Sequence, residues 1–152
     1  VLLAKRLGFS FLDVDLMIQE KTGKLLKEII AQEGMEGFLR VEERINQTIQ
    51  AVHTVIAPGG SVIYGPKAMK HLKDISQIVY LKLSYEEVVR RLGDLTDRGV
   101  AVREGMTLRD LYQERVPLYE SYADLTICEG DRGPGAVVDE LRAIMEKAMG
   151  KL

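Results

Sequence analysis

The sequence has little of what a disulfide-rich, membrane-spanning or nucleic-acid-binding protein needs. Its 152 residues contain one cysteine, Cys128, which excludes an internal disulfide framework and is typical of a reducing compartment. No stretch approaches the ~20 apolar residues of a membrane-spanning helix. The 21 basic and 23 acidic residues almost balance, so no basic excess indicates a nucleic-acid partner. These absences favour a cytoplasmic protein with neither a membrane nor a nucleic acid as partner.

The composition is that of one globular domain. Hydrophobic residues make up 46% and charged residues 29%, and a chain of this length buries enough surface for a core. We expect a single domain over residues 1–152, and either a monomer or part of a longer or fused chain. Residues 1–8 have the pattern of a helix end, with Gly8 at the position that often terminates one. Because residue 1 is Val and so short a helix is unstable alone, we expect a chain that lacks its N-terminal part.

Short apolar runs alternate with segments of helical periodicity along the chain. The expected strands cover residues 9–14, 54–57, 78–83 and 125–128. The expected helices cover residues 16–33 with an interruption at Gly23, 37–52, 64–72, 84–92, 107–122 and 134–147, and residues 95–106 have a loop pattern. This alternation predicts an α/β fold, a three-layer sandwich around a parallel sheet. In such sheets ligands bind beyond the carboxyl ends of the strands.

Two aspartates end the first expected strand. Asp13 and Asp15 are two residues apart, so strand alternation places their side chains on the same side of the chain. Paired acids at the carboxyl edge of a sheet can hold Mg²⁺ through water and orient a substrate hydroxyl. The alternative is a solvated strand end at which Asp15 caps the next helix.

Glycines and arginines supply the other candidate binding groups. Gly59 and Gly60 follow the second expected strand, where they let the backbone approach a ligand; the alternative is a tight turn. Arginine suits bidentate recognition of carboxylate or phosphate, although most surface arginines are simply solvated. Arg115 stands out because Pro117 interrupts its helical pattern. The arginines in or near expected loops are Arg98, Arg103, Arg115 and Arg132.

Taken in order, these segments resemble the shikimate kinase family, which has the P-loop, nucleoside-monophosphate-kinase-like fold. The resemblance covers nearly the whole chain, and the order and spacing of the motifs are more specific than any single motif. The stretch Glu-Arg-Val-Pro-Leu-Tyr at residues 114–119 matches closely. The other matching segments are residues 3–8 with 11–15, 22–24 with 29–34, 36–42, 55–62, 97–99 and 132–134.

The resemblance implies an activity and a role for each matching residue. The implied reaction transfers the ATP γ-phosphate to the 3-hydroxyl of shikimate, giving 3-phosphoshikimate in chorismate and aromatic amino-acid biosynthesis. It also implies a substrate-binding segment at about 16–52 and a lid at about 95–106. The implied roles are Mg²⁺ binding through water for Asp13, shikimate binding and activation of its hydroxyl for Asp15, lining of the substrate site for Gly59 and Gly60, carboxylate binding for Arg115, stabilisation of the transferred phosphate for Arg98 and contact with the adenine for Arg132.

Three departures from the family pattern change what we expect. Leu39 stands where the substrate-binding motif has arginine; Arg40, one residue later and rotated by ~100° on a helix, is kept as a candidate substrate ligand. Ser61 stands in place of a third glycine, and the lid lacks the family's Arg-Pro pair. No Gly-x-x-x-x-Gly-Lys-Ser/Thr occurs in the 152 residues, so the Walker A loop that cradles phosphates is missing.

We therefore expect a sheet with a gap where the family's central first strand lies, weak ATP binding, and no phosphorylation of shikimate by these 152 residues alone. Two alternatives stay open. The first is a kinase of another small hydroxylated acceptor, such as gluconate or a nucleotide. The second is a non-catalytic, kinase-like binding domain or a segment of a fused pathway protein. The Pro-Leu-Tyr context of Arg115 and the paired glycines favour shikimate.

Overall fold

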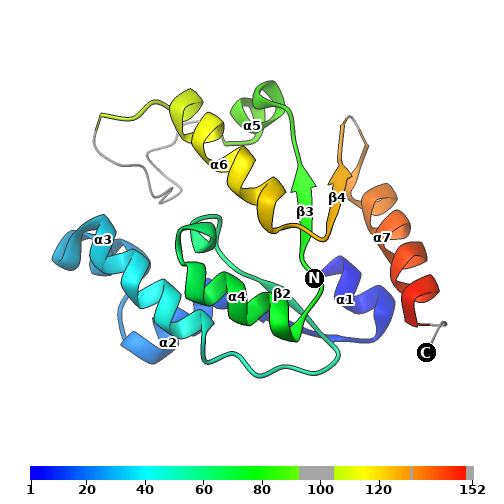
Figure 1. Ribbon diagram of the computed structural model, residues 1–152, viewed down its shortest axis with the longest axis horizontal. Helices are drawn as coiled ribbons and strands as arrows, with labels where there is room; N and C mark the ends of the chain where they lie inside the picture. The colour runs from blue at the N-terminus through cyan, green and yellow to red at the C-terminus, as the bar shows by residue number, and fades with distance from the viewer. Residues whose placement is uncertain (93–104, 131, 150–152) are drawn as a thin grey trace.

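The computed structural model describes residues 1–92, 105–130 and 132–149 (Figure 1). Its strands are β1 (Ser10–Asp13), β2 (Thr54–Ala57), β3 (Val79–Lys82) and β4 (Leu125–Cys128). Its helices are α1 (Leu2–Leu7), α2 (Val14–Thr22), α3 (Leu26–Asn46), the 3-10 turn η1 (Val62–Tyr64), α4 (Pro66–Ile75), α5 (Tyr85–Leu92), α6 (Leu108–Tyr122) and α7 (Pro134–Met149). Each observed strand lies within a predicted one, which confirms the alternating α/β pattern.

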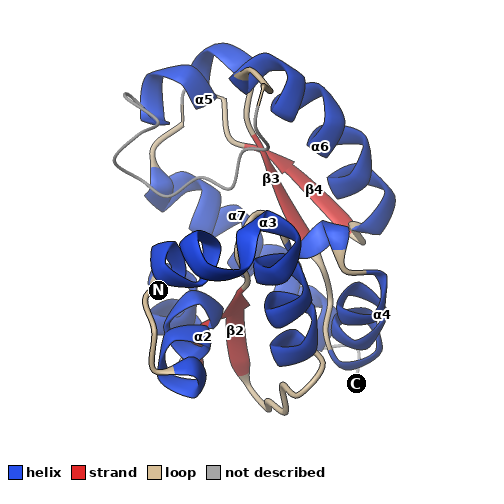
Figure 2. Ribbon diagram, turned by 90° about the vertical axis from the view of Figure 1, so that its left-hand side faces the viewer, coloured by secondary structure: helices blue, strands red, loops and turns tan. Residues whose placement is uncertain are grey.

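The four strands form two parallel pairs. In the first pair Ser10 of β1 lies opposite Thr54 of β2, and in the second Val79 of β3 lies opposite Leu125 of β4. Within the described part of the chain no ladder joins the two pairs, and Figure 2 shows β3 and β4 in the upper half of the molecule with β2 in the lower half. The parallel α/β class is confirmed, and the strands are divided as expected for a sheet with a gap.

Local sequence accounts for the start and end of α2. The Asp13 carboxylate accepts hydrogen bonds from the backbone N–H groups of Asp15 and Leu16, at 3.0 and 3.3 Å, and so caps the helix. The capping residue is therefore Asp13 and not Asp15. The predicted interruption at Gly23 is confirmed, because Gly23 adopts φ 67° and closes the helix in the left-handed region.

The next helix differs from its prediction at the C-terminal end. α3 continues from residue 26 to 46, with a break in its helical geometry at Gly34, where φ is 69°. The prediction of a helix to residue 52 is wrong, because α3 ends at Asn46. Ile49 keeps the apolar spacing because it is buried in the core from the turn that follows the helix.

Buried side chains form two clusters, one beside each strand pair. The larger cluster joins α2, α3, η1 and α4 through Val14, Ile18, Ile29, Phe38, Val41, Ile45, Ile49, Val62, Ile63, Ala68, Met69 and Leu72. The smaller one holds α7 against β4 through Ile127, Val137 and Leu141, with Leu3 of α1 packed against it. The larger cluster fixes the elements that carry the aspartates and the paired glycines.

Two predictions concern the chain outside this core. The expected lid at 95–106 and its Arg98 fall almost wholly on residues 93–104, which lie outside the described residues. Among the helices of residues 1–92, 105–130 and 132–149, none has both the length and the apolar character that crossing a membrane requires.

Candidate active site

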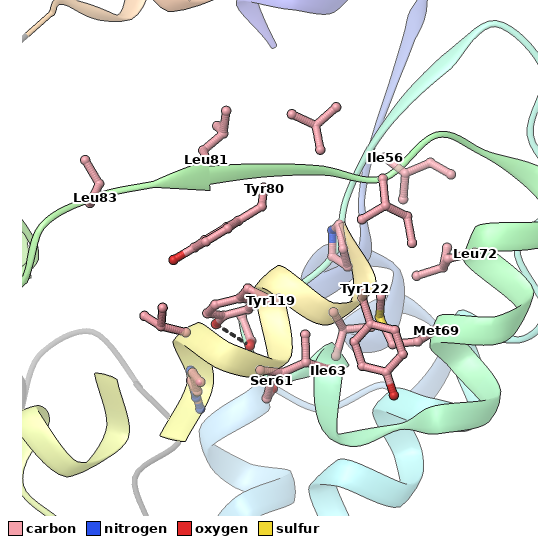
Figure 3. Close-up of a pocket in the computed structure, with 18 of the residues that line it drawn as sticks. Ile56, Ser61, Ile63, Met69, Leu72, Tyr80, Leu81, Leu83, Tyr119 and Tyr122 are labelled. Carbon is pink, nitrogen blue, oxygen red and sulfur yellow. Dashed lines mark hydrogen bonds between the residues drawn. The ribbon is translucent and has the colours of Figure 1, made fainter. Parts of the chain in front are cut away.

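A pocket of about 620 Å³ lies between the two strand pairs. One wall is apolar: Figure 3 shows Ile56, Tyr80 and Leu83 along it, and Tyr80 points from β3 toward Tyr119 of α6. The rings of Tyr80 and Tyr119 stack with centroids 5.0 Å apart. The opposite end is polar and is lined by Asp15, Gly59, Gly60, Ser61 and Arg115. An apolar pocket with a few convergent polar groups is the usual form of a small-molecule site.

The aspartates lie at the carboxyl end of β1, as predicted. Asp13 is fixed by its capping bonds, and Asp15 follows in the first turn of α2. Burial raises the pKa of Asp15, and the nearby charge of Asp13 raises it further. A carboxylate with a raised pKa is a better proton acceptor than an ordinary one, which suits a group that orients or deprotonates a hydroxyl.

A buried carboxyl group lies behind the paired glycines. Glu42 of α3 is 1% exposed. Its Oε2 accepts a hydrogen bond of 2.7 Å from the Ser61 hydroxyl, whereas its Oε1 has no hydrogen-bond partner among the described residues. Burial raises the pKa of Glu42 to about 7; Asp15 adds to this effect, while Ser61 and Arg115 oppose it. This group therefore carries a proton for much of the time at neutral pH.

The glycines of this segment are required by close contacts. A Cβ atom on Gly59 would lie 2.9 Å from Glu42 Oε1 and 3.0 Å from Asp15 Oδ1. A Cβ atom on Gly60 would lie 3.1 Å from the Tyr119 hydroxyl and 3.3 Å from Arg115 Nη1. The backbone at both positions is therefore close to polar groups of the pocket, and its approach to a ligand stays a prediction.

Arg115 reaches the pocket from α6. Its Nε donates to the Tyr64 hydroxyl at 3.4 Å, and its guanidinium carbon lies 5.5 Å from the centre of the Tyr64 ring. The Tyr64 hydroxyl donates a short hydrogen bond to Glu114 Oε1. The Tyr119 hydroxyl donates to the Gly60 carbonyl at 2.6 Å, which joins α6 to the glycine segment. Asp15 and Arg115 are the charged side chains among the described residues that line the pocket.

The other predicted arginines lie elsewhere. Arg40 is exposed, and its Nη2 lies 3.6 Å from where a Cβ on Gly37 would be, so the structure does not bring it to the pocket. Leu39, which replaces the family's arginine, packs against the larger core cluster. Arg132 follows β4 and is held by Glu140 Oε2 at 2.5 Å and by the Cys128 carbonyl.

The residues present fit the acceptor and a hydrated metal ion better than they fit a nucleotide polyphosphate. Asp13 offers a carboxylate at the strand end, and in the described part of the chain no cluster of three or more His, Cys, Asp or Glu residues holds a metal ion directly. A metal ion held through water agrees with this donor set. The sequence has no Walker A loop, and Arg115 is the one cation among the described residues of the pocket.

Four site residues escape prediction from the sequence. Glu42 lies one turn after Phe38 and three residues before Ile45, on the apolar face of its helix. A carboxylate on an apolar face is unusual, and this could have marked Glu42 as a candidate functional residue. Glu114 and Tyr119 lie in the closely matching stretch of residues 114–119, but nothing local predicts their partners, because the Tyr64–Glu114 and Tyr119–Gly60 bonds join residues 50 and 59 apart. Tyr64 has no such signal.

A parallel α/β fold with a pocket at the carboxyl ends of its strands defines the class of α/β proteins that bind small molecules. Comparisons identify the family: the family model for shikimate kinase matches residues 1–146. The shikimate kinases of Chlorobium chlorochromatii and Mycobacterium avium are 32% and 37% identical to the chain, over 97% and 90% of it and 83% and 78% of the relatives. A solved shikimate kinase from Acinetobacter baumannii, in complex with shikimate, is 31% identical, with a TM-score of 0.78 over 98% of this chain and 83% of the other. The chain belongs to the shikimate kinase family, whose members are ATP-dependent kinases that phosphorylate shikimate.

Proposed function

We propose that the polar end of the pocket binds shikimate, between Asp15 on one side and Arg115 on the other. The observation that carries this proposal is that the two groups flank Gly59 and Gly60, whose backbone approaches both of them. A guanidinium suits the carboxylate of the acceptor, and a carboxylate with a raised pKa suits its hydroxyl groups. The opposite charges at one site fix the direction in which a hydroxy acid lies.

In the proposed reaction the chain positions the 3-hydroxyl and removes its proton. ATP would supply the γ-phosphoryl group, whose bond to the β-phosphate breaks to release ADP as its bond to the 3-hydroxyl oxygen forms, and Mg²⁺ would neutralise part of the phosphate charge. Asp13 would hold the metal ion through water, and Asp15 accepts the proton of the attacking hydroxyl. Phosphoryl transfer depends on positioning and electrostatic stabilisation, so the restraint of these two carboxylates by the cap of α2 and by partial burial matters for the rate.

Two arginines complete the proposal. Arg98, outside the described residues, stabilises the charge of the transferred phosphoryl group, and residues 95–106 act as a lid that excludes water. Arg132 contacts the adenine from the segment between β4 and α7, where Glu140 and the Cys128 carbonyl restrain its guanidinium group. A cytoplasmic location and a monomeric state belong to the same proposal.

Calorimetric titration with shikimate tests the acceptor. Arg115→Ala is expected to weaken shikimate binding at least tenfold, because the carboxylate loses its cation. Arg40→Ala is the matched control, since Arg40 is exposed on α3 and away from the pocket, and its binding is expected to stay within twofold of the unsubstituted chain. Gluconate and nucleoside monophosphates are titrated in parallel. Binding of one of these, with none of shikimate, would overturn the proposed acceptor.

A further inference from the structure

The side chain of Arg115 is held from two sides, by Tyr119, which lines the pocket, and by Tyr64, which does not. Its Nε donates to the Tyr64 hydroxyl at 3.4 Å, and that hydroxyl in turn donates to Glu114. Tyr64 and Glu114 are absent from the described residues that line the pocket, whereas Arg115 is present there. Because Tyr64 does not line the pocket, it can affect a bound ligand only through its contact with Arg115.

The direction of these bonds gives Tyr64 a specific task. Its hydroxyl accepts from one residue of α6 and donates to the residue before it, so it bridges two side chains that leave the helix ~100° apart. Its ring also lies beside the guanidinium group, 5.5 Å from the guanidinium carbon to the ring centre. These contacts direct the Nε edge toward Tyr64 while Nη1 lies next to Gly60 at the pocket.

The restraint of Arg115 by Tyr64 matters more because Arg115 is the one cation among the described residues that line the pocket. Arginine has many rotamers, and part of the associated entropy is lost when it binds a carboxylate. Leu39 packs into the core and Arg40 is exposed, so neither supplies a second cation to the described lining. A site that recognises a carboxylate through one arginine depends strongly on how that arginine is oriented before the ligand arrives.

We propose that Tyr64, bonded to Glu114, is a positioning residue that orients Arg115 for the carboxylate of the acceptor. This inference rests on the proposed function for the identity of the ligand. It does not rest on it for the restraint of Arg115, which is a property of the chain without ligand.

The first test removes one oxygen atom. Tyr64→Phe keeps the ring beside Arg115 and loses both hydroxyl bonds, and we expect shikimate to bind about tenfold more weakly to it. The methyl ester of shikimate, which carries no charge on that group, is expected to bind equally to the variant and to the unsubstituted chain. An equal loss for both ligands would mean that Tyr64 acts on the general shape of the site, and the proposal would be overturned.

The matched control is Ser121→Ala. Ser121 also belongs to α6 but does not line the pocket, and its hydroxyl donates to the Leu118 carbonyl at 2.8 Å. This variant likewise loses one side-chain hydroxyl bond, so its unfolding midpoint reports the ordinary cost of such a loss. Its affinity for shikimate is expected to stay within twofold. A tenfold loss in Ser121→Ala would show that any hydroxyl removed from this helix has the same effect, which contradicts a special role for Tyr64.

A second measurement needs no ligand. The Arg115 Nε–H resonance in NMR spectra is expected to show an ordered side chain in the unsubstituted protein, and a more mobile side chain with faster hydrogen exchange in Tyr64→Phe. An unchanged Arg115 signal would overturn the positioning role even if shikimate binding falls. If the unsubstituted chain does not bind shikimate, the acceptor assignment fails, and the NMR comparison still decides whether Tyr64 orients Arg115.

Discussion

Glu42 is a carboxyl group in a place that suits an uncharged side chain. It is 1% exposed, and the charged form would lie near Asp15, with no cation among the described residues hydrogen-bonded to it. Its pKa in the folded protein, about 7, lies above the unfolded value of 4.5. The folded state therefore keeps this proton to higher pH than the unfolded state does. The stability that this provides is complete below about pH 4.5 and is lost as the pH rises through about 7.

This linkage gives a prediction for Glu42→Gln. Glutamine keeps the shape of the protonated carboxyl group, and its oxygen can still accept from Ser61. We expect similar stability to the unsubstituted chain near pH 5 and a gain on the order of 3 kcal/mol at pH 8, because the ionisation of Glu42 no longer opposes folding. Urea unfolding between pH 5 and 8 measures this. Glu36→Gln, an exposed change on the same helix, is the control, and a rise at pH 8 as large as that of Glu42→Gln would contradict the prediction.

Gly59 allows a second prediction at this scale. A Cβ atom there would lie 2.9 Å from Glu42 Oε1 and 3.0 Å from Asp15 Oδ1, so Gly59→Ala must displace carboxyl groups on both sides. We expect at least tenfold weaker shikimate binding and a loss of about 1–3 kcal/mol in the free energy of unfolding. Gly135→Ala is the matched control, because nothing lies within 4 Å of its Cβ position and it sits in α7. That variant is expected to gain about 0.5–1 kcal/mol without a change in binding. Unaltered shikimate affinity in Gly59→Ala would show that the two carboxylates do not need their present positions.

Among the elements, α2 links the stability of the fold to the charge of the site. Asp13 caps the helix through Oδ1, and its negative charge raises the pKa of Asp15. Asp13→Asn keeps an oxygen for the cap and removes the charge, so we expect stability within ~0.5 kcal/mol and a lower pKa for Asp15. Asp13→Ala removes the cap as well and is expected to lose about 1 kcal/mol. Urea unfolding and NMR titration of the Asp15 carboxyl carbon distinguish the two effects. Equal stability of the two variants would contradict the capping role.

The elements were predictable where the sequence carries local signals. Gly23 ends α2 because glycine tolerates the left-handed backbone, and Thr107 starts α6 because its hydroxyl caps the helix through the N–H of Asp110 at 3.1 Å. The end of α3 was predicted wrongly for a physical reason. Ile49 is buried from a turn, and apolar spacing records burial without recording whether the backbone is helical.

At the scale of the whole molecule, the site is assembled from segments far apart in the chain. Its strand ends follow from the alternation of elements, which is why Asp13, Asp15, Gly59 and Gly60 were predicted. The Tyr64–Glu114 bond joins residues that are 50 positions apart in the sequence, so no local pattern predicts it. The family motif has arginine at the position of Leu39, and Arg40 follows one residue later. Whether Arg40 can still reach the pocket depends on how α3 is rotated about its axis, which the sequence does not determine. Tertiary packing therefore decides what the sequence alone does not.

The division of the strands into two pairs determines which backbone amides are open to solvent. In the described part of the chain β2 is paired only with β1, and β3 only with β4, while Ile56 and residues 79–81 face the pocket between them. The backbone groups on the inner edges of β2 and β3 have no strand partner there. Backbone amides at such an edge exchange with solvent faster than those of a fully paired strand. We therefore expect fast hydrogen exchange at the backbone amides on the inner edges of β2 and β3.

The last prediction compares this chain with a longer one that begins with an extended apolar strand and a Walker A loop. We expect the longer chain to protect amides of β2 and β3 in hydrogen exchange and to convert shikimate with ATP, because the strand supplies the edge partner and the loop supplies the phosphate cradle. The matched control carries alanine in place of the loop lysine, and it should protect the same amides without turnover. The 152-residue chain is expected to show neither effect. Rapid phosphorylation of shikimate by that shorter chain would contradict the prediction and would place a phosphate site within the residues already present.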